Sequence, residues 1–248
     1  MKNNIEFYPL GEKAIVVKFG SEVNENTYEL VWNFSRSLEQ NPIYGTIEIV
    51  PTFTTVTIYY DPLTVMKSTQ SDHKYSNQYS QSAYKTILAI IQNRISKMKK
   101  TSTNIEYRSI KIPVCYEGEF APDLEYVAKY NQLSTEEVIQ IHSEGEYLVY
   151  MLGFAPGFPY MGGMSNKIAT PRRNEPRALV SAGSVGIAGG QTGIYSLNSP
   201  GGWQIIGRTP LKLFQPENES PTLLQAGDRI QFYSISTEEY TVFEEKQK

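Results

Sequence analysis

The 248-residue sequence predicts an α+β domain over residues 1–115, followed by an all-β barrel domain over residues 116–248 that begins with helices. Two observations divide the chain in this way. Apolar side chains recur at both strand and helix spacing in the first part, whereas helical periodicity is scarce after residue 147. Twelve of the 18 glycines also lie between Gly153 and Gly207, where short strands and tight turns alternate.

In the first part, β-branched and apolar runs predict strands at residues 14–19, 45–50, 54–60 and 108–115. Apolar stripes at helical spacing predict helices at residues 24–40 and 83–98. The order βαββαβ is typical of a ferredoxin-like domain, with its helices on one face of an antiparallel sheet. The polar segment 67–82, which contains His73, has no apolar period and is predicted as a surface loop.

The second part begins with two predicted helices, one at 124–130 and one that starts at Ser134 with the capping-box sequence Ser-Thr-Glu-Glu and ends at His142. Short strands are then predicted at 147–153, 178–181, 184–188, 204–207, 211–214 and 229–233. Strands this short and this closely spaced indicate a closed barrel or a sandwich.

Bulk properties exclude several classes of protein. No apolar run approaches the ~20 residues of a membrane span, and Met1 to Glu6 contains no apolar core of a signal peptide, so a cytoplasmic protein is expected. The formal charge of −3 argues against a nucleic-acid partner. Cys115 is the single cysteine and is expected to be a packed thiol, which excludes an internal disulfide and a thiol zinc site; no metal site is predicted.

A cationic cluster lies within the glycine-rich segment. Lys167, Arg172, Arg173 and Arg177 are accompanied there by a single acid, Glu175. Guanidinium groups beside glycine-rich turns with exposed N–H groups indicate a phosphate or carboxylate ligand. The alternative is a glycine-rich barrel that carries these arginines on its rim for solubility.

The segment 153–163 combines prolines and glycines with aromatic residues, so it is predicted to form a rigid turn whose rings could stack on a flat or acyl ligand. The candidate binding residues in it are Phe154, Pro156, Gly157, Phe158 and Tyr160. The alternative is a hydrophobic corner with no ligand.

A second glycine-rich segment offers Gly189, Gly190, Gln191, Thr192 and Tyr195 to a ligand. It lacks the Lys-Ser/Thr ending of a phosphate-binding P-loop, so that motif is not assigned.

Three further residues are candidates. Trp203 and Arg208 follow within the segment 199–210, where Arg208 is either an anion clamp or a structural residue. His142 is the general acid or base candidate, and its position at a helix C-terminus is expected to raise its pKa. It is equally compatible with an ordinary helix end.

The sequence resembles a family that includes the 5-oxoprolinase B-subunit, the sporulation-kinase inhibitor KipI and subunit 1 of allophanate hydrolase. The resemblance is carried by the segments 142–163, 170–177, 182–195 and 199–211, and more weakly by the segment 118–124. The resemblance implies a cyclophilin-like barrel and a multi-subunit enzyme. With the A- and C-subunits of 5-oxoprolinase, such a protein would convert 5-oxoproline to glutamate at the expense of ATP with Mg²⁺. The chain contains no biotin-acceptor region.

The leading hypothesis, a catalytic subunit that binds 5-oxoproline and ATP with its partner, gives roles to the candidates. Arg172, Arg177 and Arg208 would converge on one pocket and hold carboxylate or phosphate oxygens, Gln191 and Thr192 would orient the lactam, and His142 would transfer a proton. The alternatives are an inhibitor that docks on a histidine kinase, and half of a urea or amide carboxyltransferase.

Three positions depart from the family pattern. Ser181 and Ser196 stand where proline is expected, and Arg173 stands where an apolar residue is usual. Ser181 is expected to loosen a turn, and Arg173 to alter or enlarge the anion site.

Overall fold

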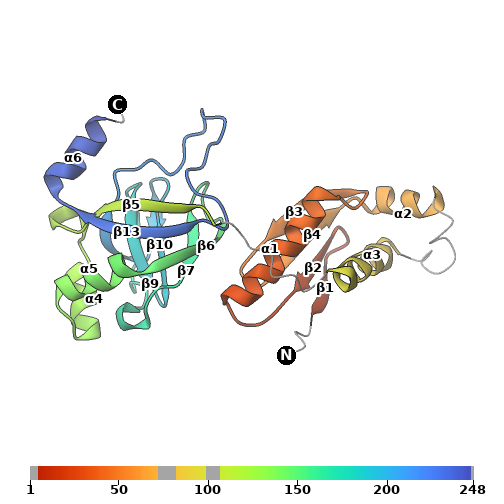
Figure 1. The fold of residues 1–248 in the computed structure, drawn as a ribbon, viewed down its shortest axis with the longest axis horizontal. Coiled ribbons are helices and arrows are strands. Elements are labelled where there is room, and N and C mark those ends of the chain that lie inside the picture. Colours follow the sequence, from red (N-terminus) through yellow and green to blue (C-terminus); the bar gives the residue numbers. More distant parts are fainter. Residues whose placement is uncertain (1–4, 72–81, 99–106, 247–248) are drawn as a thin grey trace. The chain divides into compact units, whose positions relative to one another are not determined.

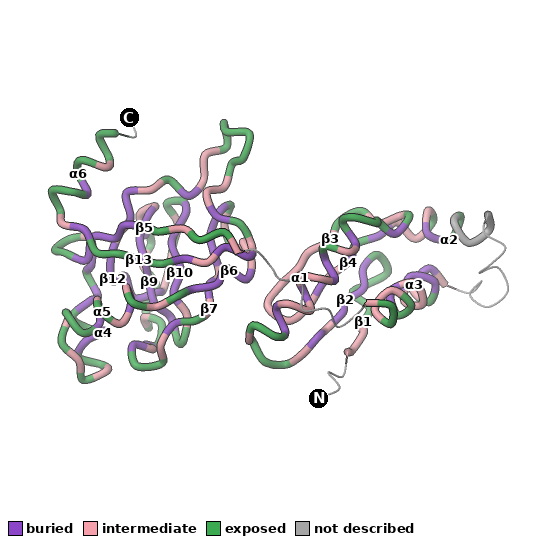
Figure 2. Tube along the Cα trace, in the orientation of Figure 1, coloured by how far each residue is buried: buried purple, intermediate pink, exposed green. Residues whose placement is uncertain are grey.

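The computed structural model describes residues 5–71, 82–98 and 107–246, and the chain divides into two compact units, residues 1–104 and 105–248 (Figure 1). The division therefore falls after Asn104 rather than after Cys115. Each unit has its own hydrophobic core, which Figure 2 shows as buried stretches along the central strands of each.

The N-terminal unit contains one four-stranded antiparallel sheet in the order β1-β2-β4-β3. The strands are β1 (Glu6–Leu10), β2 (Ala14–Lys18), β3 (Thr46–Pro51) and β4 (Thr55–Tyr60). The helices are α1 (Glu25–Gln40), α2 (Pro62–Ser71) and α3 (Ala83–Lys97). Residues 67–71, predicted as loop, belong to α2, while residues 72–81, including His73, lie outside the described residues.

The helices of this unit form where capping groups and apolar stripes coincide. The side chain of Asn24 accepts a hydrogen bond from the N–H of Thr27 at 2.9 Å and begins α1, and Ser82 caps α3 in the same way. The apolar stripe of α1, with Val31, Phe34 and Leu38, packs into the same core as the inward side chains of β2 and β4. Burial of these stripes holds the helices on the sheet.

The predicted ferredoxin-like domain is not confirmed, because its closing strand is not part of this sheet. Strand β5 (Ser109–Cys115) instead pairs in parallel along its whole length with β13 (Arg229–Ile235) in the second unit. The apolar alternation of residues 108–115 correctly indicated a strand. It could not indicate the partner, since pairing is decided by contacts far away in the sequence.

The second unit is built on a closed seven-stranded barrel in the order β10-β7-β6-β13-β5-β12-β9, which confirms the predicted barrel. Besides β5 and β13, its strands are β6 (Glu146–Leu152), β7 (Pro159–Gly162), β9 (Ser184–Ala188), β10 (Gln191–Ile194) and β12 (Gln204–Arg208). A separate two-stranded sheet pairs β8 (Arg177–Val180) with β11 (Ser199–Gly201). The predicted strand at 211–214 is wrong, since only Phe214 pairs there, in an isolated bridge to Thr222.

Helices α4 (Leu124–Asn131) and α5 (Thr135–Glu144) pack against the barrel, and α6 (Thr237–Glu245) ends the described chain. The predicted capping box of α5 is present, with reciprocal bonds between Ser134 and Glu137. Cys115 is buried beside α6, as expected. None of the helices in the described residues is both long enough and apolar enough to span a membrane.

Candidate functional site

Five aromatic side chains form a cluster around Phe158. The ring of Phe158 lies edge-to-face with Phe154, Tyr160, Tyr195 and Trp203, at centroid separations of 5.4, 5.1, 5.6 and 5.7 Å. Phe158, Tyr195 and Trp203 belong to a small apolar core that is distinct from the main core of the barrel unit. The predicted aromatic residues of the segments 153–163, 183–195 and 199–210 are thus brought together.

Glycines make room for these rings. A Cβ atom on Gly193 would approach both Phe158 and Trp203 to 3.0 Å, and one on Gly201 would lie 2.2 Å from the Tyr195 hydroxyl. Since real Cβ contacts of 2.2 Å do not occur, Gly201 is required for the position of Tyr195. Gly193 and Gly201 are therefore explained by the close packing of aromatic rings.

Phe154 is the exposed member of the cluster. Its backbone is in the left-handed region, at φ +68°, which is unfavourable for a bulky residue, and its side chain is 65% exposed. The turn that holds it is closed by a hydrogen bond from the N–H of Gly153 to the carbonyl of Phe158 at 3.1 Å, and Gly157, at φ +76°, packs on the backbone of Leu213. Pro156 is exposed on the same turn. A rigid turn therefore presents one aromatic ring to solvent.

Two of the predicted arginines lie on the segment next to this cluster, since Arg177 pairs with Gly201, which adjoins the Tyr195 hydroxyl, and the N–H of Arg173, the residue after Arg172, donates to the carbonyl of Gly202 at 2.8 Å. The pKa of Tyr195 is raised by burial, and this effect is opposed by a hydrogen bond from the Trp203 backbone and by the positive charges of Arg172 and Arg177. Arg172 is exposed and makes no hydrogen bond or ion pair within the described residues. We refer to these residues together as the aromatic–arginine face: Phe154, Phe158, Tyr160, Arg172, Arg177, Tyr195 and Trp203.

Arg177 and Arg173 share a buried carboxylate that sequence reasoning missed. Asp123 accepts hydrogen bonds from Arg173 Nη1 at 3.0 Å and from Arg177 Nη2 at 2.7 Å. Asp123 precedes α4, so its sequence position suggests a helix cap, but its side chain makes no capping bond. The one available signal was its place in the weakly matching segment 118–124. Arg173 thus adds a second cation to the Asp123 carboxylate.

His142 lies in the barrel core and has no exposed surface. The Thr192 hydroxyl donates to the carbonyl of Gly186 at 3.1 Å, so it accepts from His142 Nε2 at 3.0 Å. The opposite ring nitrogen, Nδ1, then accepts from the Tyr116 hydroxyl at 2.8 Å. This bonding fixes the neutral tautomer that carries its proton on Nε2.

The expectation that the helix terminus raises the pKa of His142 is wrong. Burial lowers the pKa of His142 to about 3, because the charged imidazolium would lose its hydration inside the barrel. The ring also stacks on Phe232 at 4.5 Å. Neither His142 nor the fully buried Thr192 presents an atom to a ligand in this structure.

Arg208 does not join the other arginines, so the predicted convergence is wrong for this residue. Its Nε donates to the carbonyl of Ala182 at 3.0 Å, and its charge acts on Tyr240 of α6 rather than on Tyr195. A β-bulge changes which face of a sheet the following side chains lie on, and β12 has a register shift between Ile205 and Gly207, just before Arg208. Spacing along the sequence could not reveal this direction.

The remaining predicted residues lie at a hairpin. Gly189 and Gly190 are the exposed two-residue turn between β9 and β10, with Gly189 at φ +58°, and Gln191 begins β10 half-buried. Gly189 exchanges two backbone hydrogen bonds with Thr170. These glycines are explained by the tight turn. The turn at Ser181 is closed by a bond from the N–H of Ser184 to its carbonyl, despite the absence of proline.

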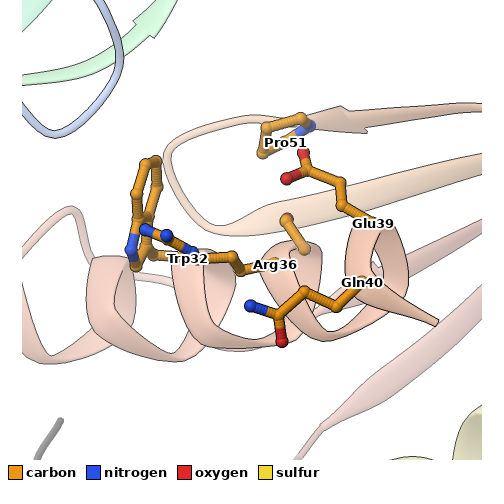
Figure 3. A pocket seen from close by; sticks show the side chains of 6 residues that line it. Trp32, Arg36, Glu39, Gln40 and Pro51 are labelled. Carbon is orange, nitrogen blue, oxygen red and sulfur yellow. The ribbon is translucent and has the colours of Figure 1, made fainter.

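A pocket of about 360 Å³ lies in the N-terminal unit, between α1 and β3 (Figure 3). Trp32, Arg36, Glu39, Gln40 and Pro51 line it together with Ser35, and the Arg36 guanidinium lies 5.8 Å from the centre of the Trp32 ring. None of the residues predicted as a site lines this pocket. Within residues 5–71, 82–98 and 107–246, no group of three or more His, Cys, Asp or Glu residues is placed to hold a metal ion.

Comparisons with known proteins identify the family. A family model described as carboxyltransferase domain, subdomain C and D, matches residues 5–224. The chain is 47% identical to the 5-oxoprolinase B-subunit of Bacillus subtilis over 96% of its length and 95% of that protein, and 38% identical to the Escherichia coli O157:H7 protein of the same name, over 91% and 94%. It is also 24% identical to urea amidolyase of Lachancea kluyveri, but spans only 14% of that protein.

Solved structures agree with this assignment. A conserved protein from Pyrococcus horikoshii is 40% identical and matches 95% of this chain and all of its own, with a TM-score of 0.53. The protein TTHA0988 is 31% identical with a TM-score of 0.72 over 90% of this chain, which spans 40% of that longer chain. Urea amidolyase of K. lactis, 21% identical with a TM-score of 0.75, shares the fold. The chain belongs to the carboxyltransferase-domain family and, within it, to the 5-oxoprolinase B-subunit proteins.

Proposed function

We propose that the chain is the B-subunit of an ATP-dependent 5-oxoprolinase and acts with the A- and C-subunits to convert 5-oxoproline to glutamate. The support is the 47% identity to a protein of that name along almost the whole of both chains. In the net reaction one water adds across the lactam C–N bond to give glutamate, and a second water is consumed as ATP, supplied with Mg²⁺, is converted to ADP and phosphate.

We place the ligand site on the aromatic–arginine face. The observation that carries this placement is the exposed side chain of Arg172, which has no partner among the described residues and whose neighbour in sequence, Arg173, bonds the Gly202 carbonyl next to Trp203. Both substrates are anions, and 5-oxoproline also has an apolar ring. A guanidinium can hold carboxylate or phosphate oxygens and stabilise negative charge that develops on the lactam oxygen, while the exposed Phe154 ring offers a surface for the substrate ring.

His142, Thr192 and Arg208 are not part of this proposal. The first two are enclosed in the barrel core, and Arg208 bonds the Ala182 carbonyl.

The experiment is a reconstitution with an omission control. The full chain, mixed with the A- and C-subunits, is incubated with 5-oxoproline and MgATP, and glutamate and ADP are measured together. Equimolar release of both products that stops when the chain is omitted supports the proposal. Absence of turnover by a complex that is intact on size-exclusion chromatography contradicts it.

A urea or amide carboxyltransferase half is a second candidate, favoured by the 24% identity with urea amidolyase across 97% of this chain. It would require a biotin carrier. Carboxylation of urea by the chain with its partner and a carboxylated biotin carrier, in the absence of 5-oxoproline turnover, distinguishes the two. The histidine-kinase inhibitor remains a prediction, which an autophosphorylation assay with the purified chain would test.

A further inference from the structure

Asp123 connects three parts of the barrel unit through one buried carboxylate that is 4% exposed. One oxygen, Oδ1, accepts from both Arg173 and Arg177, and the other, Oδ2, accepts from the backbone N–H of Ile205 at 2.6 Å. The backbone N–H of Asp123 donates back to the carbonyl of Ile205 at 2.9 Å. The carboxylate therefore fixes the segment before β8, the start of β8 and strand β12 relative to α4.

A second buried carboxylate in the same unit, that of Asp228, forms a structural pair with Arg108 and serves as a comparison. Asp228 accepts from Arg108 through both oxygens, at 2.8 Å from Nε and 2.6 Å from Nη2, and it also accepts from the N–H of Gln225 at 2.7 Å. One guanidinium and one carboxylate match there in a bidentate pair. At Asp123, one carboxylate serves two guanidiniums, and each donates through a single nitrogen.

The shared carboxylate leaves cationic character on the aromatic–arginine face. The two guanidiniums of Arg173 and Arg177 against the one carboxylate of Asp123 leave a positive charge. Exposed Arg172 adds a second positive charge, which acts on Tyr195, and exposed Glu175 on the same segment adds a negative one. The Nη1 atom of Arg177 is buried without a hydrogen-bond partner in the described residues. A buried N–H without an acceptor is unfavourable, so this orientation of Arg177 depends on the bond to Asp123.

We propose that Asp123 is a positioning residue that holds Arg177 of the aromatic–arginine face, together with Arg173, in place and so sets the site for the anionic substrate. The inference rests on the proposed function. Asp123 does not touch substrate. It acts through Arg177, whose charge reaches Tyr195, and through the contact with Ile205 that aligns β12.

The test compares Asp123→Asn with the matched control Asp228→Asn in the reconstituted complex. Both substitutions neutralise a buried carboxylate that accepts two guanidinium bonds and one backbone N–H bond, so both lower stability. At a temperature where both complexes are folded, Asp123→Asn is expected to lower kcat/KM for 5-oxoproline on the order of 10- to 100-fold, chiefly through KM, because the guanidiniums move. Asp228→Asn is expected to keep the wild-type KM. Equal KM values in the two variants would overturn the proposal.

A second readout does not depend on turnover. The Nη–H signals of Arg173 and Arg177, the groups that bond Asp123, are expected in low-temperature ¹⁵N spectra of the full chain to be dispersed and slow to exchange in wild type and in Asp228→Asn, and to move to the solvent-averaged position in Asp123→Asn. Unchanged signals in Asp123→Asn would overturn the positioning role. If the wild-type complex shows no turnover but these signals behave as expected, the proposed function fails and the positioning by Asp123 stands.

Discussion

The buried imidazole of His142 makes the stability of the barrel unit depend on pH in a defined window. Burial lowers the pKa of His142 to about 3, compared with about 6.5 for an unfolded histidine. Between these values the unfolded chain binds a proton that the folded chain does not. The free energy of unfolding is therefore unaffected by this histidine above the unfolded pKa of about 6.5, and it decreases as the pH drops below that value.

The magnitude follows from the same two pKa values. At pH 5 the unfolded histidine is almost fully protonated and the folded one is neutral, which costs about 2 kcal/mol of stability relative to pH 8. The loss would reach about 4 kcal/mol at pH 3, where carboxylates titrate as well. The window from pH 8 to pH 5 largely avoids the carboxylates, and comparison with a His142 variant separates His142 from His73, the other histidine.

The assay is urea unfolding of wild type and His142→Gln at pH 8, 7, 6 and 5. Gln can donate to Thr192 and accept from Tyr116 but does not titrate. Both proteins carry Trp32→Phe, so that Trp203, the other of the two tryptophans, reports the barrel unit alone. Wild type is expected to lose about 2 kcal/mol more than the variant between pH 8 and pH 5. Parallel pH profiles would refute the argument that burial keeps this imidazole neutral.

Three further predictions concern packing around the site. Thr192→Val removes a hydroxyl that bonds the His142 imidazole and a backbone carbonyl, and is expected to lower the free energy of unfolding in urea by about 1–3 kcal/mol. The control, Ser196→Ala, removes a buried hydroxyl with no partner in the described residues and is expected to leave the free energy of unfolding unchanged. Equal losses in the two variants would contradict the assigned bonds. Gly201→Ala places a Cβ against the Tyr195 hydroxyl, so it is expected to lower the free energy of unfolding by about 1–3 kcal/mol and to change the near-ultraviolet circular dichroism spectrum. A spectrum identical to that of wild type would contradict this packing. Phe154→Gly is expected to raise stability by about 1 kcal/mol because it relieves a left-handed backbone, and a melting temperature below that of wild type would show that the exposed ring contributes more than the strain costs.

The local pattern of apolar residues in the sequence was sufficient to predict most of the helices and strands. Apolar periodicity predicted α1, α3, β4 and β6, and the Ser134 capping box is present in α5. The strand at residues 109–115 was found but assigned to the wrong sheet, because its parallel partner, β13, lies more than a hundred residues further along the chain. Among the strands of three or four residues, β8 was predicted, whereas β7, β10 and β11 were missed, because so few residues establish no clear period.

The site was predicted in part for a similar reason. Residue types indicated the aromatic residues and Arg172 as candidates, but the contacts of Phe158 with Tyr195 and Trp203 join segments that are separated in the sequence. The positions of His142 and Arg208 depend on which side of an element faces the core, and a single residue at a helix or strand end does not reveal this. Asp123 was missed because an aspartate before a helix is usually a cap.

The most direct test of the ligand site measures kcat/KM for 5-oxoproline in the reconstituted complex, with Arg172→Ala compared against Lys111→Ala, which removes an exposed cation from β5. Loss of a charge-assisted hydrogen bond to the substrate, about 1.5–3 kcal/mol, predicts that Arg172→Ala lowers kcat/KM by roughly 10- to 100-fold while Lys111→Ala leaves it at the wild-type value. Wild-type kcat/KM in Arg172→Ala would contradict the placement of the substrate on the aromatic–arginine face.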